Sequence, residues 1–84
     1  MKIKFAWTPR QETKDTSHVV DWDVLPRKGD VVRLRVLHET PAYHDDQYAW
    51  MAVDFLVDRV LIPEVPSAAQ VGVIEINLIY TGPK

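Results

Sequence analysis

The chain of 84 residues contains no cysteine and only three glycines. The lack of cysteine excludes a disulfide framework, a thiolate zinc site and a cysteine nucleophile. The glycines form no Gly-x-Gly-x-x-Gly or Walker loop for phosphate, and no Gly-x-Ser-x-Gly nucleophile elbow occurs. The sequence therefore argues against an enzyme, and we expect neither catalysis nor a cofactor.

Long hydrophobic runs and a strong charge of one sign are also missing. Residues 1–7 lack the apolar core of a signal peptide, and charged residues interrupt the chain too often for a membrane-spanning helix. A formal net charge of −2 gives no general attraction to nucleic acids or anionic membranes. We expect a cytoplasmic protein without membrane contact, whose binding is local.

The composition that remains, 46% hydrophobic and 26% charged residues, is that of an ordinary folded domain. The length fits a single β domain over residues 1–84, which buries only about 60% of its unfolded surface. Its main pattern is the alternation of apolar and polar residues that is typical of half-buried strands. Polar stretches at about 8–17 and 38–47 predict loops. The alternation predicts strands at residues 2–7, 19–24, 31–37 and 48–62, and a fifth that begins at Val71.

A Pro-Arg-Lys-Gly-Asp turn at residues 26–30 leads directly into the strand at 31–37. We expect the strands on either side of this turn to pair with each other. The register that keeps their apolar faces together places Trp22 opposite Leu34. The same register sets two opposite-charge pairs on the polar face, Asp21–Arg35 and Asp23–Arg33. The most basic strand would then be neutralised by its neighbour.

Residues 48–62 are almost continuously apolar and predict a long strand, bent or bulged near Asp58. A helix over residues 49–61 is the main alternative, because several side chains there recur at intervals of three and four. The content of β-branched and aromatic residues favours the strand. Residues 67–70 are expected to form a single helical turn. The last strand should direct one apolar set to the core: Ile74, Ile76, Leu78 and Tyr80.

These elements predict an all-β fold, a small five- to six-stranded antiparallel SH3-like barrel or sandwich. The run Leu-Pro-Arg-Lys-Gly-Asp-Val-Val at residues 25–32, with the alternating strands that follow it, resembles short phage- and prophage-encoded proteins of uncharacterised function. In those proteins a Pro-x-x-Gly-Asp-x-Val turn opens the central strands of an SH3-like barrel. This chain departs from them in its long connection at residues 38–47. The resemblance implies a small accessory or interaction protein and assigns no functional residue.

Apolar residues also occupy positions that the alternation assigns to the outer face of the sheet. They are Trp50, Leu56, Val60, Val73 and Ile79. Either barrel closure covers this face, or the face is exposed for a partner. Aromatic side chains concentrate binding energy at interfaces. We therefore expect contacts with a protein partner, or with a second copy in a homodimer, through Trp50, Leu56, Tyr43 and His44.

Four basic residues define a second hypothesis, a nucleic-acid-binding barrel. They are Arg27, Lys28, Arg33 and Arg35. Such a surface needs aromatic rings beside its cations, because bases stack on the rings while cations follow the phosphates, and the candidate rings are Trp7, Trp22 and Trp50. Alternation places Trp22 on the face opposite Arg33 and Arg35, and the expected aspartate partners offset their charge. Both points disfavour nucleic-acid binding.

Three histidines and three acids supply the atoms for a third hypothesis, a metal-dependent enzyme. They are His18, His38, His44, Glu39, Asp45 and Asp46. Their spacing matches no ligand motif. Acid and base catalysis by the carboxylates would need a desolvation that a polar loop does not provide. We expect no bound metal.

Overall fold

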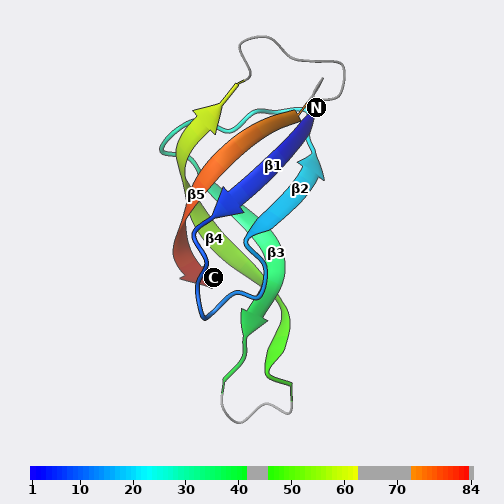
Figure 1. The fold of residues 1–84 in the computed structure, drawn as a ribbon, viewed down its shortest axis with the longest axis vertical. Coiled ribbons are helices and arrows are strands. Elements are labelled where there is room, and N and C mark those ends of the chain that lie inside the picture. The colour runs from blue at the N-terminus through cyan, green and yellow to red at the C-terminus, as the bar shows by residue number, and fades with distance from the viewer. Residues whose placement is uncertain (42–45, 63–72, 84) are drawn as a thin grey trace.

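The computed structural model describes residues 1–41, 46–62 and 73–83, and these form strands and connections without a helix (Figure 1). The strands are β1 (Lys2–Trp7), β2 (Ser17–Asp21), β3 (Val31–Glu39), β4 (Tyr48–Leu61) and β5 (Val73–Pro83). They build one strongly curled mixed sheet, a half-barrel, in the order β2-β1-β5-β4-β3. In this part of the chain there is no helix long and apolar enough to cross a membrane.

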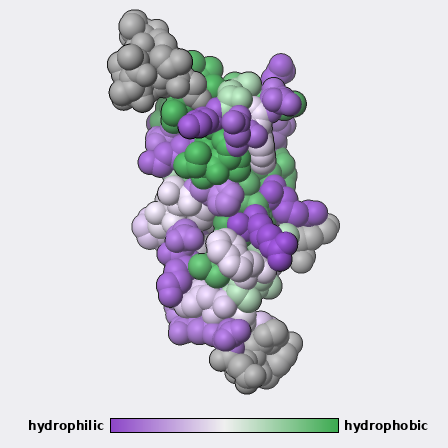
Figure 2. Space-filling view, turned by 90° about the vertical axis from the view of Figure 1, so that its right-hand side faces the viewer, coloured by the Kyte–Doolittle hydropathy of each residue, from purple (hydrophilic) through white to green (hydrophobic). Residues whose placement is uncertain are grey.

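The all-β prediction is confirmed, but the prediction of a purely antiparallel sheet is wrong. β1 and β2 form one antiparallel hairpin, and β3, β4 and β5 form an antiparallel meander. The two units join where β1 lies parallel to β5. β2 and β3 therefore end up as the two edges of the sheet. On the side where β2 lies in Figure 1, hydrophobic side chains gather in the upper half and are bordered by hydrophilic ones (Figure 2).

The predicted pairing of the strands around the turn is also wrong. Leu34 lies opposite Val53 of β4, not opposite Trp22, which follows the end of β2 and packs edge-on against Phe5 with ring centroids 5.2 Å apart. The two predicted charge pairs are replaced. Asp54 of β4 binds Arg33 at 2.8 Å, and Asp21 accepts a hydrogen bond from the Met1 ammonium at 3.0 Å. β4 also sets its apolar face against that of β3 and places one acid, Asp54, opposite Arg33, so face matching alone did not choose between β4 and residues 19–24.

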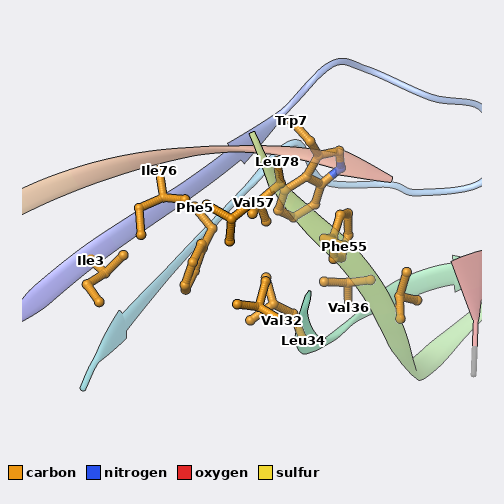
Figure 3. Close-up of a cluster of buried hydrophobic side chains, with 11 residues drawn as sticks. Ile3, Phe5, Trp7, Val32, Leu34, Val36, Phe55, Val57, Ile76 and Leu78 are labelled. Carbon is orange, nitrogen blue, oxygen red and sulfur yellow. The ribbon is translucent and has the colours of Figure 1, made fainter. Parts of the chain in front are cut away.

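The core lies on the inner side of the curl, and every strand except β2 contributes fully buried side chains (Figure 3). β1 and β3 alternate between buried and exposed positions as the sequence predicts. The buried set comprises Ile3, Phe5, Trp7, Val32, Leu34, Val36, Val53, Phe55, Val57, Ile76 and Leu78. Ile74 and Tyr80 pack against it as partly buried residues, which confirms the predicted inner side of the last strand.

β4 settles the choice between strand and helix in favour of the strand. Its pairing with β5 shifts by one residue between Val57 and Arg59, so Asp58 is the extra residue of a bulge, as predicted. The bulge reverses the alternation, and Val60 turns inward to pack against the core. The expectation that Val60 faces outward is therefore wrong. The helical turn expected at residues 67–70 lies outside the described residues.

The turn before β3 is fixed to the bulged part of β4. Within the turn, the Asp30 N–H donates to the Arg27 carbonyl at 2.9 Å, and the Arg27 N–H donates to the Asp30 carboxylate at 2.8 Å. The Gly29 N–H donates to the Val57 carbonyl, and the Val57 N–H donates to the Asp30 carbonyl, both at 2.8 Å. The backbone of Gly29 has a φ of 94°, a conformation that residues with a side chain rarely adopt.

Replacing this glycine should destabilise the fold through backbone strain. Nothing lies within 4 Å of a Cβ built at Gly29, so a Gly29→Ala substitution creates no clash. The left-handed conformation alone should lower the free energy of unfolding by about 1–2 kcal/mol. Urea denaturation measures this change. Lys28→Ala in the same exposed turn is the control and should stay close to wild type; equal stability of both variants would contradict the strained turn.

Candidate functional site

The outer face of the half-barrel carries a row of apolar side chains across three adjacent strands. Val31 of β3 lies opposite Leu56 of β4, and Leu56 lies opposite Ile79 of β5. Val31 is 63% exposed and Ile79 is 48% exposed, while Leu56 between them is half-buried. We call these three residues the outer row. They project away from the core, so the sheet itself does not cover them.

A hollow of about 460 Å³ lies beside one end of the outer row. Ile79 belongs to its lining, together with Arg59 and Asn77, which face each other across β4 and β5. Asp58, the extra residue of the bulge, also lines it. The outer row therefore borders a depression lined by an acidic and a basic side chain, Asp58 and Arg59. A partner protein that covers both places can set an apolar side chain on the row and a polar one in the depression.

The structure divides the partner site that the sequence predicts. Trp50 is 57% exposed on the outer face of β4, opposite Leu37. Leu56 lies six positions further along the strand, a distance of about 20 Å at 3.3 Å per residue. Trp50 and Leu56 therefore belong to two different patches of one face. Tyr43 and His44 lie outside the described residues.

The basic residues of the second hypothesis divide in a similar way. Arg27 and Lys28 lie in the turn before β3, whereas Arg33 and Arg35 project from the outer face of β3 itself. The Arg33 guanidinium is held by Asp54. Arg35 lies opposite Ala52 and makes no ion pair with any residue in the described ranges.

Trp50 changes one argument against nucleic-acid binding. Its register partner Leu37 is two residues from Arg35, so Trp50 and Arg35 are diagonal neighbours on the same outer face. Such diagonal pairs have Cα atoms about 7–8 Å apart. Trp22 does lie on the core side, as predicted, whereas Trp50, another of the candidate rings, is exposed on the outer face. An exposed aromatic ring and an unpaired cation therefore share one surface.

A polar cluster that the sequence analysis missed lies at the other end of the half-barrel. The buried His38 ring approaches the Tyr80 hydroxyl with its Nε2 at 2.6 Å and the Glu39 carbonyl with its Nδ1 at 2.8 Å. Because a carbonyl only accepts, Nδ1 carries a hydrogen, and in a neutral ring Nε2 accepts from Tyr80. The signal was present: His38 continues the alternation that buries Val36, although residues 38–47 were assigned to a loop.

The segment between β1 and β2 is held over this cluster. The Arg10 guanidinium stacks on the Tyr80 ring, 4.3 Å from its centroid, and binds Glu12 through two hydrogen bonds. The buried Thr13 hydroxyl accepts a hydrogen bond from the Trp7 indole at 3.2 Å. These contacts tie the loop to the core. Both ring nitrogens of His38 are already engaged, by Glu39 and Tyr80. We call His38, Tyr80, Arg10 and Glu12 together the clamp, and their contacts serve the structure.

The electrostatics of the clamp follow from its contacts. Burial raises the pKa of the Tyr80 hydroxyl above its ordinary value of 10.0, and the nearby Glu12 carboxylate acts in the same direction. The hydrogen bonds from Arg10 lower the pKa of Glu12, and the same hydrogen bonds raise the pKa of Arg10. At neutral pH the tyrosine is therefore a neutral donor and the other two groups form an ion pair.

The structure does not bring together those histidines and acids of the third hypothesis that it describes. His18 lies on β2 opposite Phe5, whereas His38 lies on β3 and is hydrogen-bonded to Tyr80 of β5. Glu39 and Asp46 are exposed, while His44 and Asp45 lie outside the described residues. Within the described ranges no group of three or more histidine and acidic side chains is placed to hold a metal ion.

No protein-family model, curated protein or solved structure matches this chain.

The clamp makes a prediction for alkaline pH. Because the protonated phenol is favoured in the fold, Tyr80 contributes stability that is complete below its ordinary pKa of 10.0 and is lost as the pH rises through the folded pKa. An absorbance titration of tyrosinate should show a late component that Tyr80→Phe removes. In the urea-unfolded chain this component should move to the ordinary value; a late component that persists in Tyr80→Phe would contradict the assignment.

Proposed function

We propose that the chain is a non-catalytic protein-interaction module that binds through the outer row of Val31, Leu56 and Ile79. The observation that carries this proposal is the register, which aligns three apolar side chains across β3, β4 and β5 on the solvent side. Scattered exposed apolar residues are common on protein surfaces, but a contiguous row beside a hollow is typical of a contact surface.

The energetics favour an interface at this place. Full burial of an aliphatic side chain stabilises a complex by about 1.5–3 kcal/mol, so the outer row supplies a hydrophobic centre. A stable interface covers about 800 Å² on each partner and surrounds such a centre with a polar rim. The Arg33–Asp54 pair on one side and the hollow with Arg59 and Asn77 on the other provide that rim. The simplest occupant is a second copy of the chain.

A charge at the end of the outer row tests the proposal. Ile79→Asp should shift the chain from dimer to monomer in light-scattering chromatography, because burying a carboxylate in an apolar contact is costly. Val19→Asp is the matched control, since Val19 is 62% exposed on the outer side of β2, away from the outer row. The dimer of wild type and control should persist at high salt.

Circular dichroism of both variants confirms that each keeps its fold. A dimer that survives Ile79→Asp and dissociates in Val19→Asp would overturn the outer row as the contact surface. A wild-type chain that stays monomeric at all concentrations and salts would remove self-association and leave a different protein as the only occupant.

One observation favours a second function, the binding of single-stranded nucleic acid at Trp50. The exposed indole and the neighbouring Arg35 combine a stacking surface with a cation. The remaining basic residues weaken the case, because Arg33 is neutralised by Asp54 and the turn with Arg27 and Lys28 lies at the other end of β3. Any such site is small and centred on one aromatic ring.

Tryptophan fluorescence tests this second function. A single-stranded oligonucleotide at low salt should quench the exposed Trp50, and the effect should weaken steeply as salt is added. Trp50→Ala should abolish the response, whereas Lys28→Gln at the far turn should preserve it. Fluorescence that does not change with oligonucleotide at low salt would eliminate nucleic-acid binding at Trp50.

A further inference from the structure

The free edge of β3 divides into a covered and an open part. Over its last residues the segment between β1 and β2 folds against it (Figure 1). There the Lys14 N–H donates to the Leu37 carbonyl at 3.1 Å, and the Glu39 N–H donates to the Glu12 carbonyl at 2.7 Å. No other segment in the described ranges makes backbone hydrogen bonds along this edge. Among the described residues, nothing therefore pairs from this side with its first six residues, Val31 to Val36, and we call them the open edge.

The pairing shows which backbone groups face the open edge. In an antiparallel ladder the N–H and C=O groups of alternate residues point to the same side of the strand. The backbone groups of Leu37 and Glu39 point to the edge, because they bond to Lys14 and Glu12. The register of β3 with β4 runs without interruption from Val31 to Glu39. The N–H and C=O groups of Val31, Arg33 and Arg35 therefore also point to the edge, and all three residues are exposed.

The side chains at this edge select the chemistry of an added strand. Arg33 and Arg35 project from its outer side, where Asp54 neutralises Arg33 but Arg35 keeps its charge unpaired among the described residues. A strand added beside β3 places every second side chain on this outer side and the others on the core side. Side chains of the added strand on the outer side should be acidic, because they lie beside Arg35, and those on the core side should be apolar.

A second copy of the chain fits this edge poorly. In a two-fold antiparallel pairing of β3 with β3, the residues that face the edge pair with one another. Within residues 31–36, each such register that keeps both Arg33 and Arg35 paired sets an arginine opposite an arginine. Like charges in directly opposite positions destabilise a sheet. Charge therefore favours a foreign strand at this edge.

We propose that the open edge of β3 binds an extended acidic segment of a partner protein, which adds to the half-barrel as a further strand. The backbone groups of Val31, Arg33 and Arg35 supply hydrogen bonds, and Arg35 selects acidic side chains on the outer side. This site uses backbone groups at the edge of the sheet, whereas the outer row contacts partners through side chains on the face, and Val31 is the one residue that belongs to both.

Two synthetic peptides provide the probe, one alternating glutamate and valine and the other alternating lysine and valine. Amide hydrogen exchange and chemical shifts of the folded protein measure binding. The glutamate peptide should slow exchange at the Val31, Arg33 and Arg35 amides, and this effect should weaken with salt. The lysine peptide should leave these amides unchanged.

Substitutions separate the charge from the backbone. Arg35→Gln keeps the edge N–H and should weaken binding of the glutamate peptide about two- to fivefold. Arg35→Pro also removes that N–H, which pairs with nothing in the β3–β4 ladder, and should weaken binding about tenfold or more. Lys4→Gln on the outer side of β1 is the control for charge loss and should bind as wild type does.

Several outcomes would overturn the proposal. They are slow exchange at the three amides in the free protein, equal binding of both peptides, no binding of either, and binding that leaves the three amides unprotected. Ile79→Asp should bind the glutamate peptide normally. Loss of the dimer in that variant together with intact peptide binding would show that the two surfaces are independent.

Discussion

The parallel pairing of β1 with β5 is the constraint on which the structure depends. It runs from Lys2 opposite Val73 to Trp7 opposite Leu78 and joins the β1–β2 hairpin to the β3–β4–β5 meander. A two-stranded hairpin alone is at best marginally stable in water. The pairing brings Phe5 beside Ile76, and both side chains are fully buried. It also makes β2 and β3 the edges of the sheet.

The bulge at Asp58 is the second constraint, and it shapes the outer face. On one side of it Leu56 points outward and joins Val31 and Ile79 in the outer row; on the other side Val60 points to the core. The turn before β3 docks on Val57 at the same place. The bulge at Asp58 therefore separates, along β4, the outward-facing Leu56 of the outer row from the hollow that Arg59 lines.

Much of the local structure could be predicted because it depends on alternation. The buried positions of β1 and β3, the long strand with its bend near Asp58 and the exposed Trp50 all follow from a period of two. Alternation does not say which strand lies beside which. Residues 19–24 offer two acids to the arginines of β3 and β4 offers one, Asp54, so the register with Trp22 opposite Leu34 was reasonable from the sequence and wrong in the fold.

The proposed surfaces depend on pairing between distant residues, and for that reason the sequence revealed them only in part. Leu56 and Ile79 were identified as outward-facing, but their alignment with Val31 requires the β3–β4–β5 order. The clamp of His38 and Tyr80 joins residues that are 42 positions apart. A bulge changes the direction of later side chains, and the prediction for Val60 failed because it ignored that change.

Cross-strand nuclear Overhauser effects between backbone protons test the parallel pairing of β1 with β5, which makes β3 an edge of the sheet, and the β3–β4 register, on which the outer row depends. The account predicts contacts of the parallel type between β1 and β5, centred on Phe5 and Ile76. It also predicts that Leu34 contacts Val53 across β3 and β4. Contacts between Trp22 and Leu34, with none between Phe5 and Ile76, would contradict it, because β3 would then have no open edge.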